Sequence, residues 1–216
     1  MRLKTFFTIS AALLTGIPVS GQQIAWDAPS FFSPRPMDDI GLYVSQTQYP
    51  GGGSSTGLSG IWRQSGNLNL GVRAGVGDLE DAGGTVLVGA ELYGPLNRLL
   101  PSTSVDLSWM LGGGAVFGDN YTLFSMPLGI SIGMRLGTGA VQFAPYVHPR
   151  WSLDIAAFDV NGTEQTRTGG SIVIDAGADV SLGQRFILRL GGSFLDREAF
   201  GAGVALRWPR PISVVR

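Results

Sequence analysis

The residues of this 216-residue chain that could do chemistry begin with its only histidine, His148, which is followed by Ser152 and Asp154. A serine, a histidine and an aspartate within hydrogen-bond reach of one another can activate the serine hydroxyl for attack on an ester. All three lie on the polar face of one alternating segment, where His148 and Asp154 are about 20 Å apart in an extended strand. They are too far apart to form a triad unless another strand supplies a partner. A membrane-embedded lipid-modifying hydrolase that uses His148 stays an alternative, and a structural role for His148 is preferred.

Acidic pairs and glycine-rich stretches are the other candidates for chemistry. Asp175 and Asp179 are four residues apart on one strand, about 13 Å, which is too far for a shared proton or a common metal ion. The stretches GVRAGVG (71–77) and GGGAVFG (112–118) resemble phosphate-binding loops in composition, but no helix is predicted after either. The chain has no cysteine, and hence no disulfide and no thiol for lipid attachment. We therefore expect that the protein is not an enzyme and that it binds neither a metal ion nor an organic cofactor.

The elements that carry these residues are predicted by a strict alternation of apolar and polar side chains. In NLNLGVRAGVG, residues 67–77, Leu, Val and Ala alternate with Asn, Gly and Arg. A period of two residues is typical of a β-strand with one apolar and one polar face. Prolines at 127, 145 and 149 fall inside such segments and predict bulges or bends. The ten predicted strands are 38–48, 56–64, 67–77, 84–94, 104–117, 124–136, 140–155, 171–182, 185–194 and 199–208, with longer outer loops such as 159–170.

The polar face indicates which side of these strands is inside. It carries mostly Gly, Ser and Ala around charged residues, and Lys4 is the only lysine of the chain. Small residues suit the crowded interior of a narrow barrel, and buried arginines and carboxylates in nearly equal number can pair there. Together with Arg63, the residues that we expect in a structural charge network of the lumen are Arg73, Glu91, Asp106, Arg135, His148, Arg150, Asp154, Asp175, Asp179, Arg189 and Arg207.

These features predict an all-β protein, a closed antiparallel up-and-down transmembrane β-barrel of about ten strands, with eight as the alternative. In such a barrel the apolar face contacts lipid, and each strand needs about 9–11 residues to cross the membrane. A secreted or periplasmic ligand-binding β-sandwich, with the polar face in water, stays open as an alternative at this point.

With this pattern, residues 38–208 resemble the small bacterial outer-membrane β-barrel proteins of the OmpA/OmpX-like kind. The resemblance implies location in the cell outer membrane, contact with its lipid, insertion by the barrel-assembly machinery and a monomer. It also implies a non-enzymatic role, structural or as a narrow passive pore with an ion-paired lumen. Such proteins usually finish on an aromatic residue, whereas PRPISVVR follows Trp208 here. The formal net charge of −1 gives no reason to expect a nucleic-acid partner.

The two ends of the chain lack the alternation. Arg2 and Lys4 precede a short apolar run that ends at Val19 before small residues, which is typical of a cleaved secretory signal peptide. We predict a signal peptide over 1–21 and export of the chain. Residues 22–37, rich in proline and aromatic residues, are predicted to form a periplasmic leader outside the main fold, and residues 209–216 a C-terminal tail.

Overall fold

The computed structural model describes residues 29–35, 38–48, 54–66, 69–79, 83–97, 104–119, 121–137, 139–160 and 163–208. The predicted signal peptide, part of the predicted leader and the C-terminal tail lie outside the described residues. The strands are β1 (Asp39–Gln48), β2 (Ser54–Gln64), β3 (Asn69–Leu79), β4 (Gly83–Pro95), β5 (Val105–Phe117), β6 (Tyr121–Met134), β7 (Val141–Val160), β8 (Thr163–Leu182), β9 (Phe186–Leu195) and β10 (Glu198–Arg207).

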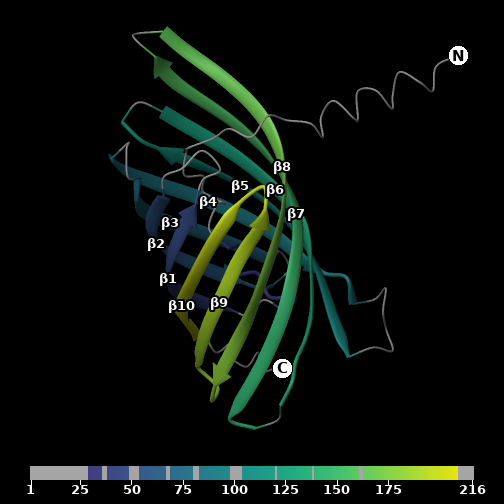
Figure 1. Cartoon of the computed structure of the whole chain (residues 1–216). Coiled ribbons are helices and arrows are strands. Elements are labelled where there is room, and N and C mark those ends of the chain that lie inside the picture. The colour runs from purple at the N-terminus through teal and green to yellow at the C-terminus, as the bar shows by residue number, and fades with distance from the viewer. Residues whose placement is uncertain are drawn as a thin grey trace, which may run out of the picture.

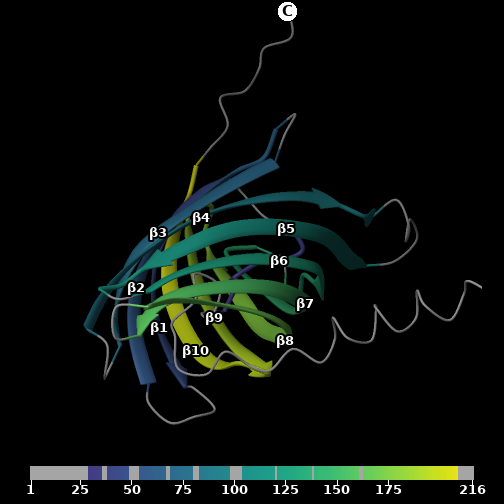
Figure 2. The same cartoon turned by 90° about the horizontal axis from the view of Figure 1, so that it is seen from above.

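The ten strands form one closed barrel (Figures 1 and 2). Each strand pairs antiparallel with its neighbour in sequence, and β10 closes the sheet against β1, with Ile40 opposite Leu206. The predicted fold class is therefore confirmed, with ten strands rather than eight. The β-sandwich alternative is wrong, because the described strands form a single sheet without an inner face shared by two sheets.

The prolines inside the strands leave the register of strand pairing unchanged. Pairing between β5 and β6 stops around Pro127 and resumes in the same register on its far side. Pairing between β6 and β7 does the same around Pro149, and Pro145 lies in an unbroken ladder with β8. The bulges predicted at these positions are therefore absent. A proline removes one backbone donor, and here the neighbouring strand keeps its register despite that loss.

The β7–β8 hairpin is longer than predicted. Its two strands pair along their whole lengths, up to Val160 opposite Thr163, and Figure 1 shows the hairpin projecting beyond the short β9 and β10. The predicted outer loop 159–170, which contains Arg167, is therefore mostly strand. Threonines at 163, 166 and 168 favour an extended backbone, and they continue the pairing above the barrel.

Side chains are distributed inside out relative to a protein dissolved in water. Large apolar side chains such as Leu42 and Phe200 are 65% and 62% exposed on the outer surface, whereas Asp39 and Arg189 are each 1% exposed inside. The interior also holds an apolar cluster near the loop ends of β4 to β7 away from the chain termini, which includes Leu87, Val116, Tyr121 and Leu123. The barrel interior, or lumen, is thus packed with side chains of both kinds.

Candidate functional site in the barrel lumen

Residues 29–35, hereafter the lumen segment, lie inside the barrel. Ser30, Phe31 and Phe32 are 1% exposed or less. Phe31 stacks on Tyr43 of β1 with ring centroids 4.5 Å apart, and Phe32 meets the edge of Tyr93 of β4 at 5.5 Å. The predicted leader outside the fold is therefore wrong for these residues. Each buried phenylalanine is worth about 1.5–3 kcal/mol relative to water, and the lumen provides aromatic partners for both.

The barrel wall binds the backbone of the lumen segment. Arg63 of β2 donates from Nη1 to the Phe31 carbonyl at 2.8 Å and from Nη2 to the Ser30 carbonyl at 3.0 Å. Ser131 of β6 donates to the Phe32 carbonyl at 2.7 Å, and Ser108 of β5 donates to the Pro34 carbonyl. A buried carbonyl without a partner is costly, so these donors are what allow an irregular segment to lie inside the barrel.

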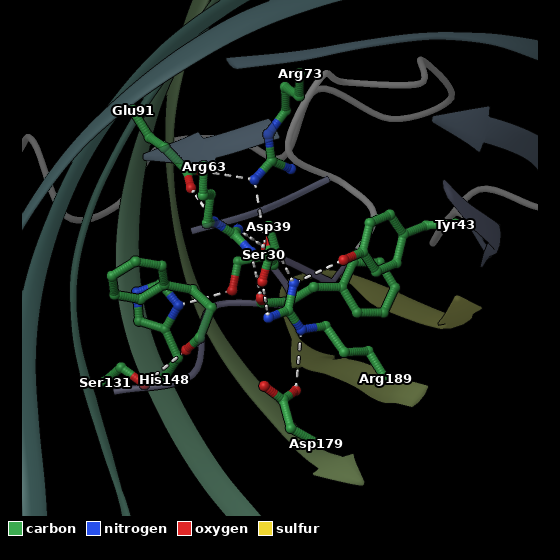
Figure 3. A network of polar contacts seen from close by, with 12 residues as sticks. Ser30, Asp39, Tyr43, Arg63, Arg73, Glu91, Ser131, His148, Asp179 and Arg189 are labelled. Carbon is green, nitrogen blue, oxygen red and sulfur yellow. Dashed lines mark hydrogen bonds and ion pairs between the residues drawn. The ribbon is translucent and has the colours of Figure 1, made fainter. Parts of the chain in front are cut away.

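Ser30 joins the lumen segment to the only histidine. Its hydroxyl lies 2.7 Å from His148 Nδ1 (Figure 3), and its backbone N–H donates to Asp175 Oδ2 at 3.2 Å. The same Nδ1 also lies 3.7 Å from Asp175, whereas a catalytic triad needs the serine and the aspartate at opposite ring nitrogens. His148 has no exposed surface for a substrate. This arrangement holds the lumen segment in place and gives no support to the hydrolase alternative.

The two other residues of that alternative have partners of their own. The Ser152 hydroxyl accepts a bond from Arg150 Nη1 at 3.4 Å. Asp154 accepts a bond from the Ser125 hydroxyl at 2.6 Å and pairs with Arg197 from the β9–β10 connection. The spacing argument from the sequence, which kept Ser152 and Asp154 away from His148, agrees with these contacts.

Three groups of buried ion pairs surround the lumen segment, and Figure 3 shows the first and the third of them. In the first, Glu91 of β4 binds Arg63 at 2.5 Å and Arg73 at 2.8 Å. The second is on β7 and β8, where Asp175 binds Arg150 through both of its oxygens. In the third, Arg189 of β9 binds Asp179 at 3.2 Å and Asp39 at 2.5 Å, and it also donates to the Tyr43 hydroxyl.

Further charges lie toward the barrel end that carries the chain termini. Asp106 pairs with Arg35 of the lumen segment at 2.5 Å and accepts a bond from Asn97 at 3.2 Å. Arg207, at the end of β10, is half-buried and donates to the Ser181 hydroxyl at 3.3 Å. The predicted network residues thus occupy interior positions, with one exception.

The exception is Arg135, which is exposed and lies just beyond the end of β6 at Met134. Because the strand has ended there, the alternation no longer determines the direction of its side chain. Partial burial, together with the positive charges of Arg35 and Arg207 nearby, lowers the pKa of Arg135. The lumen carboxylates Asp106 and Asp179 act on its pKa in the opposite direction, so Arg135 lies at the exposed edge of the network and outside its buried pairs.

The network residues expected from the sequence lack three partners that the structure brings in. Asp39 stands on the inward face of β1, and the sequence already favours an arginine-paired lumen role for it. Arg197 lies in a connection and Arg35 in the lumen segment, where no periodicity indicates which way a side chain points. These two arginines could be found only from the folded chain.

The described residues lack a metal-type cluster and a membrane-spanning helix. No group of three or more His, Asp and Glu side chains among these residues could hold a metal ion. In the same part of the chain, no helix has the length and apolar character needed to cross a membrane.

The comparisons with known proteins concern the barrel as a whole. No protein-family model matches the chain, and no curated protein matches its sequence. Among solved structures, the chain is similar to Neisserial surface protein A, with 16% identity and a TM-score of 0.38 over 79% of this chain and 95% of that one. It is similar to the beta domain of the Bordetella autotransporter BrkA, with 10% identity and a TM-score of 0.47 over 79% and 97%. A third similar structure is the N-terminal β-barrel domain of Pseudomonas aeruginosa OprF, with 12% identity and a TM-score of 0.40 over 81% and 100%. At these identities the likeness is one of fold alone, and the specific family stays a prediction.

Proposed function

We propose that this chain is an integral, non-enzymatic protein of the bacterial outer membrane, with a structural role and a lumen that is closed at rest. The observation that carries the proposal is the inside-out distribution of side chains over a closed barrel. Charged side chains are buried in the interior, and large apolar side chains are exposed around the outside. Such an outer surface is unfavourable in water and favourable in hydrocarbon.

The strand lengths and the tryptophans support a membrane location. Eight of the ten strands have 10–14 residues, and a tilted strand needs about 9–11 residues to cross the hydrocarbon core. Trp62 and Trp208 are exposed and lie near the barrel end that carries the chain termini. Exposed tryptophans are enriched at the boundary between hydrocarbon and water, which supports a position of this end at one face of the membrane.

The occupied lumen favours a closed barrel over the narrow passive pore. Side chains of eight strands, β1 to β8, contact the lumen segment, through Tyr43, Arg63, Arg73, Tyr93, Ser108, Ser131, His148 and Asp175. The buried ion pairs fill further space around it. Ions would have to displace these groups to pass, so we expect the wild-type protein not to conduct at rest.

The experiment tests the face assignment and the closed lumen on the same refolded preparations. Ile130 is exposed in the middle of β6, and Ile130→Arg should cost about 2–4 kcal/mol in lipid vesicles. Thr166→Arg adds the same charge on the exposed extension of β8 and should leave the stability unchanged. Wild-type protein should fractionate with the outer membrane, migrate differently on a gel before and after boiling, and stay silent in planar bilayers. Equal stability of the two variants would contradict the membrane location, and steady wild-type conductance would contradict the closed lumen.

A further inference from the structure

Two guanidinium groups share one carboxylate beside the lumen segment. Glu91 accepts a bond from Arg63 Nε on one oxygen and from Arg73 Nη2 on the other. All three side chains are at most 4% exposed. The group therefore carries two positive charges for one negative charge, and this excess lies in the interior of the barrel.

The remaining donors of this pair point to the lumen segment. The Ser30 carbonyl oxygen lies between the two guanidinium groups, 3.0 Å from Arg63 Nη2 and 3.3 Å from Arg73 Nη2. Arg63 Nη1 binds the next carbonyl, that of Phe31. Two nitrogens of one guanidinium that bind two oxygens form the geometry in which arginine binds carboxylates and phosphates. The carbonyl oxygens of the segment thus occupy positions suited to the oxygens of an anion.

Two lumen carboxylates near the segment, Asp175 and Asp179, have arginine partners on the barrel wall. Asp175 accepts bonds from Arg150 and from the Ser193 hydroxyl, and Asp179 accepts a bond from Arg189. Without the segment, Asp175 would lose the bond from the Ser30 N–H and keep its other donors. Arg63 and Arg73 would lose the carbonyl oxygens of Ser30 and Phe31 as acceptors. Asp106, at the start of β5, would also lose Arg35 of the segment but would keep its bond from Asn97. Around Arg63 and Arg73, the groups freed toward the empty lumen would therefore be mostly donors.

The lumen segment can leave without breaking the barrel. It precedes β1 and takes no part in strand pairing. It contacts the wall through hydrogen bonds, an ion pair and ring contacts, and the chain has no cysteine to tie it to the wall. Withdrawal of the segment would therefore expose the wall donors while the sheet stays closed.

From these contacts we infer that Arg63 and Arg73 form a binding site for a small oxyanion, which the carbonyl oxygens of Ser30 and Phe31 occupy while the barrel is closed. The inference rests on the proposed function, because it takes the lumen segment as the closed state of a membrane barrel. Withdrawal of the segment opens a path that favours anions over cations, and an oxyanion such as sulfate binds in this path and blocks it.

The test opens the barrel by weakening the lumen segment alone. Phe31→Ala with Phe32→Ala removes the ring contacts with Tyr43, Tyr93, His148 and Arg63 and leaves every strand residue unchanged. Gly201→Val is an independent second route, because a Cβ on Gly201 would lie 2.6 Å from Phe31 Cζ and would push the ring away. Currents are recorded in planar bilayers across a potassium chloride gradient, and sodium sulfate is then added on one side.

We expect channel openings in both opened forms. The reversal potential should lie close to the equilibrium potential of chloride rather than that of potassium, and sulfate should block the current. Adding Arg73→Gln to either form should weaken the sulfate block by about tenfold or more, since a hydrogen bond to a charged group contributes about 1.5–3 kcal/mol. Arg167→Gln, at an exposed arginine that packs on the Phe158 ring above the barrel, is the matched control and should leave the block unchanged.

The possible failures are distinguishable. Cation-selective or sulfate-insensitive openings would overturn the anion site and leave the closed barrel intact as a proposal. Opened forms that fold, as judged by heat-modifiable migration, but stay silent would overturn the inference as well. Failure of both forms to fold would contradict the claim that the segment is separable from the sheet. Conductance of the wild-type protein at rest would instead overturn the proposed function.

Discussion

Substitution of Arg63 should destabilise the folded barrel more than any substitution at the barrel ends. The Arg63 side chain is 1% exposed, binds Glu91 at 2.5 Å and donates to two carbonyls of the lumen segment. Removing one partner of a buried ion pair costs about 3–5 kcal/mol. Glu91 keeps its second partner, Arg73, at 2.8 Å. The loss of the Arg63–Glu91 pair should therefore cost the lower end of this range, about 3 kcal/mol. Each carbonyl left without its donor adds about 1 kcal/mol, which brings the expected cost of Arg63→Ala to about 4–5 kcal/mol.

The matched control is Arg135→Ala. Arg135 is exposed beyond the end of β6, so the same substitution should cost about 0–1 kcal/mol there. The assay is denaturant unfolding of the refolded protein in lipid vesicles, followed by tryptophan fluorescence and by migration on an unboiled gel. Equal losses for Arg63→Ala and Arg135→Ala would refute the reasoning, because they would mean that Arg63 is not buried among fixed partners.

Two further predictions concern the crowded wall and the start of the mature chain. Gly41→Val should destabilise the barrel by about 1–3 kcal/mol, because a Cβ there would lie 2.5 Å from the Tyr43 hydroxyl. At Gly113 no atom lies within 4 Å of an added Cβ, so Gly113→Val should have a smaller effect in the same unfolding assay. Comparable losses for both glycines would contradict the crowding argument. N-terminal sequencing of the exported protein should begin near Gln22, since Arg2, Lys4 and the short apolar run predict cleavage after Gly21; a retained Met1 would contradict the predicted signal peptide.

The fold could be predicted from the sequence because alternation is a local property. In a strand, every second side chain points to the same side, so a run such as 69–79 specifies its faces without reference to its neighbours. The small polar face around Arg73 and Glu91 then indicated a crowded interior. The length of the β7–β8 hairpin escaped prediction, because residues 163–170 combine polar composition with strand pairing that depends on the opposite strand.

The candidate site could be predicted only in part, because half of it lies on a segment without periodicity. The sequence around Phe31 and Phe32 shows no alternation, and its direction into the lumen depends on Tyr43, Tyr93 and Arg63 from three different strands. Which arginine pairs with which carboxylate likewise depends on strand register across the barrel. The sequence could therefore identify most of the wall and none of the segment that the wall binds.

The most direct test of the central claim, that the lumen segment lies inside the barrel, is a disulfide between Pro29→Cys and Gly191→Cys. A Cβ on Gly191 would lie 3.1 Å from the Pro29 Cβ, which a shift of a few tenths of an ångström brings to the ~3.5–4.5 Å of a disulfide. The chain has no native cysteine to compete. The control pair is Pro29→Cys with Gly89→Cys, at which an added Cβ contacts Arg73 and the Gly113 carbonyl instead. We predict that mild oxidation of the folded barrel cross-links the first pair and leaves the control pair as free thiols. Free thiols in both pairs, freely modified by a bulky reagent, would contradict a lumen closed by its own N-terminal segment.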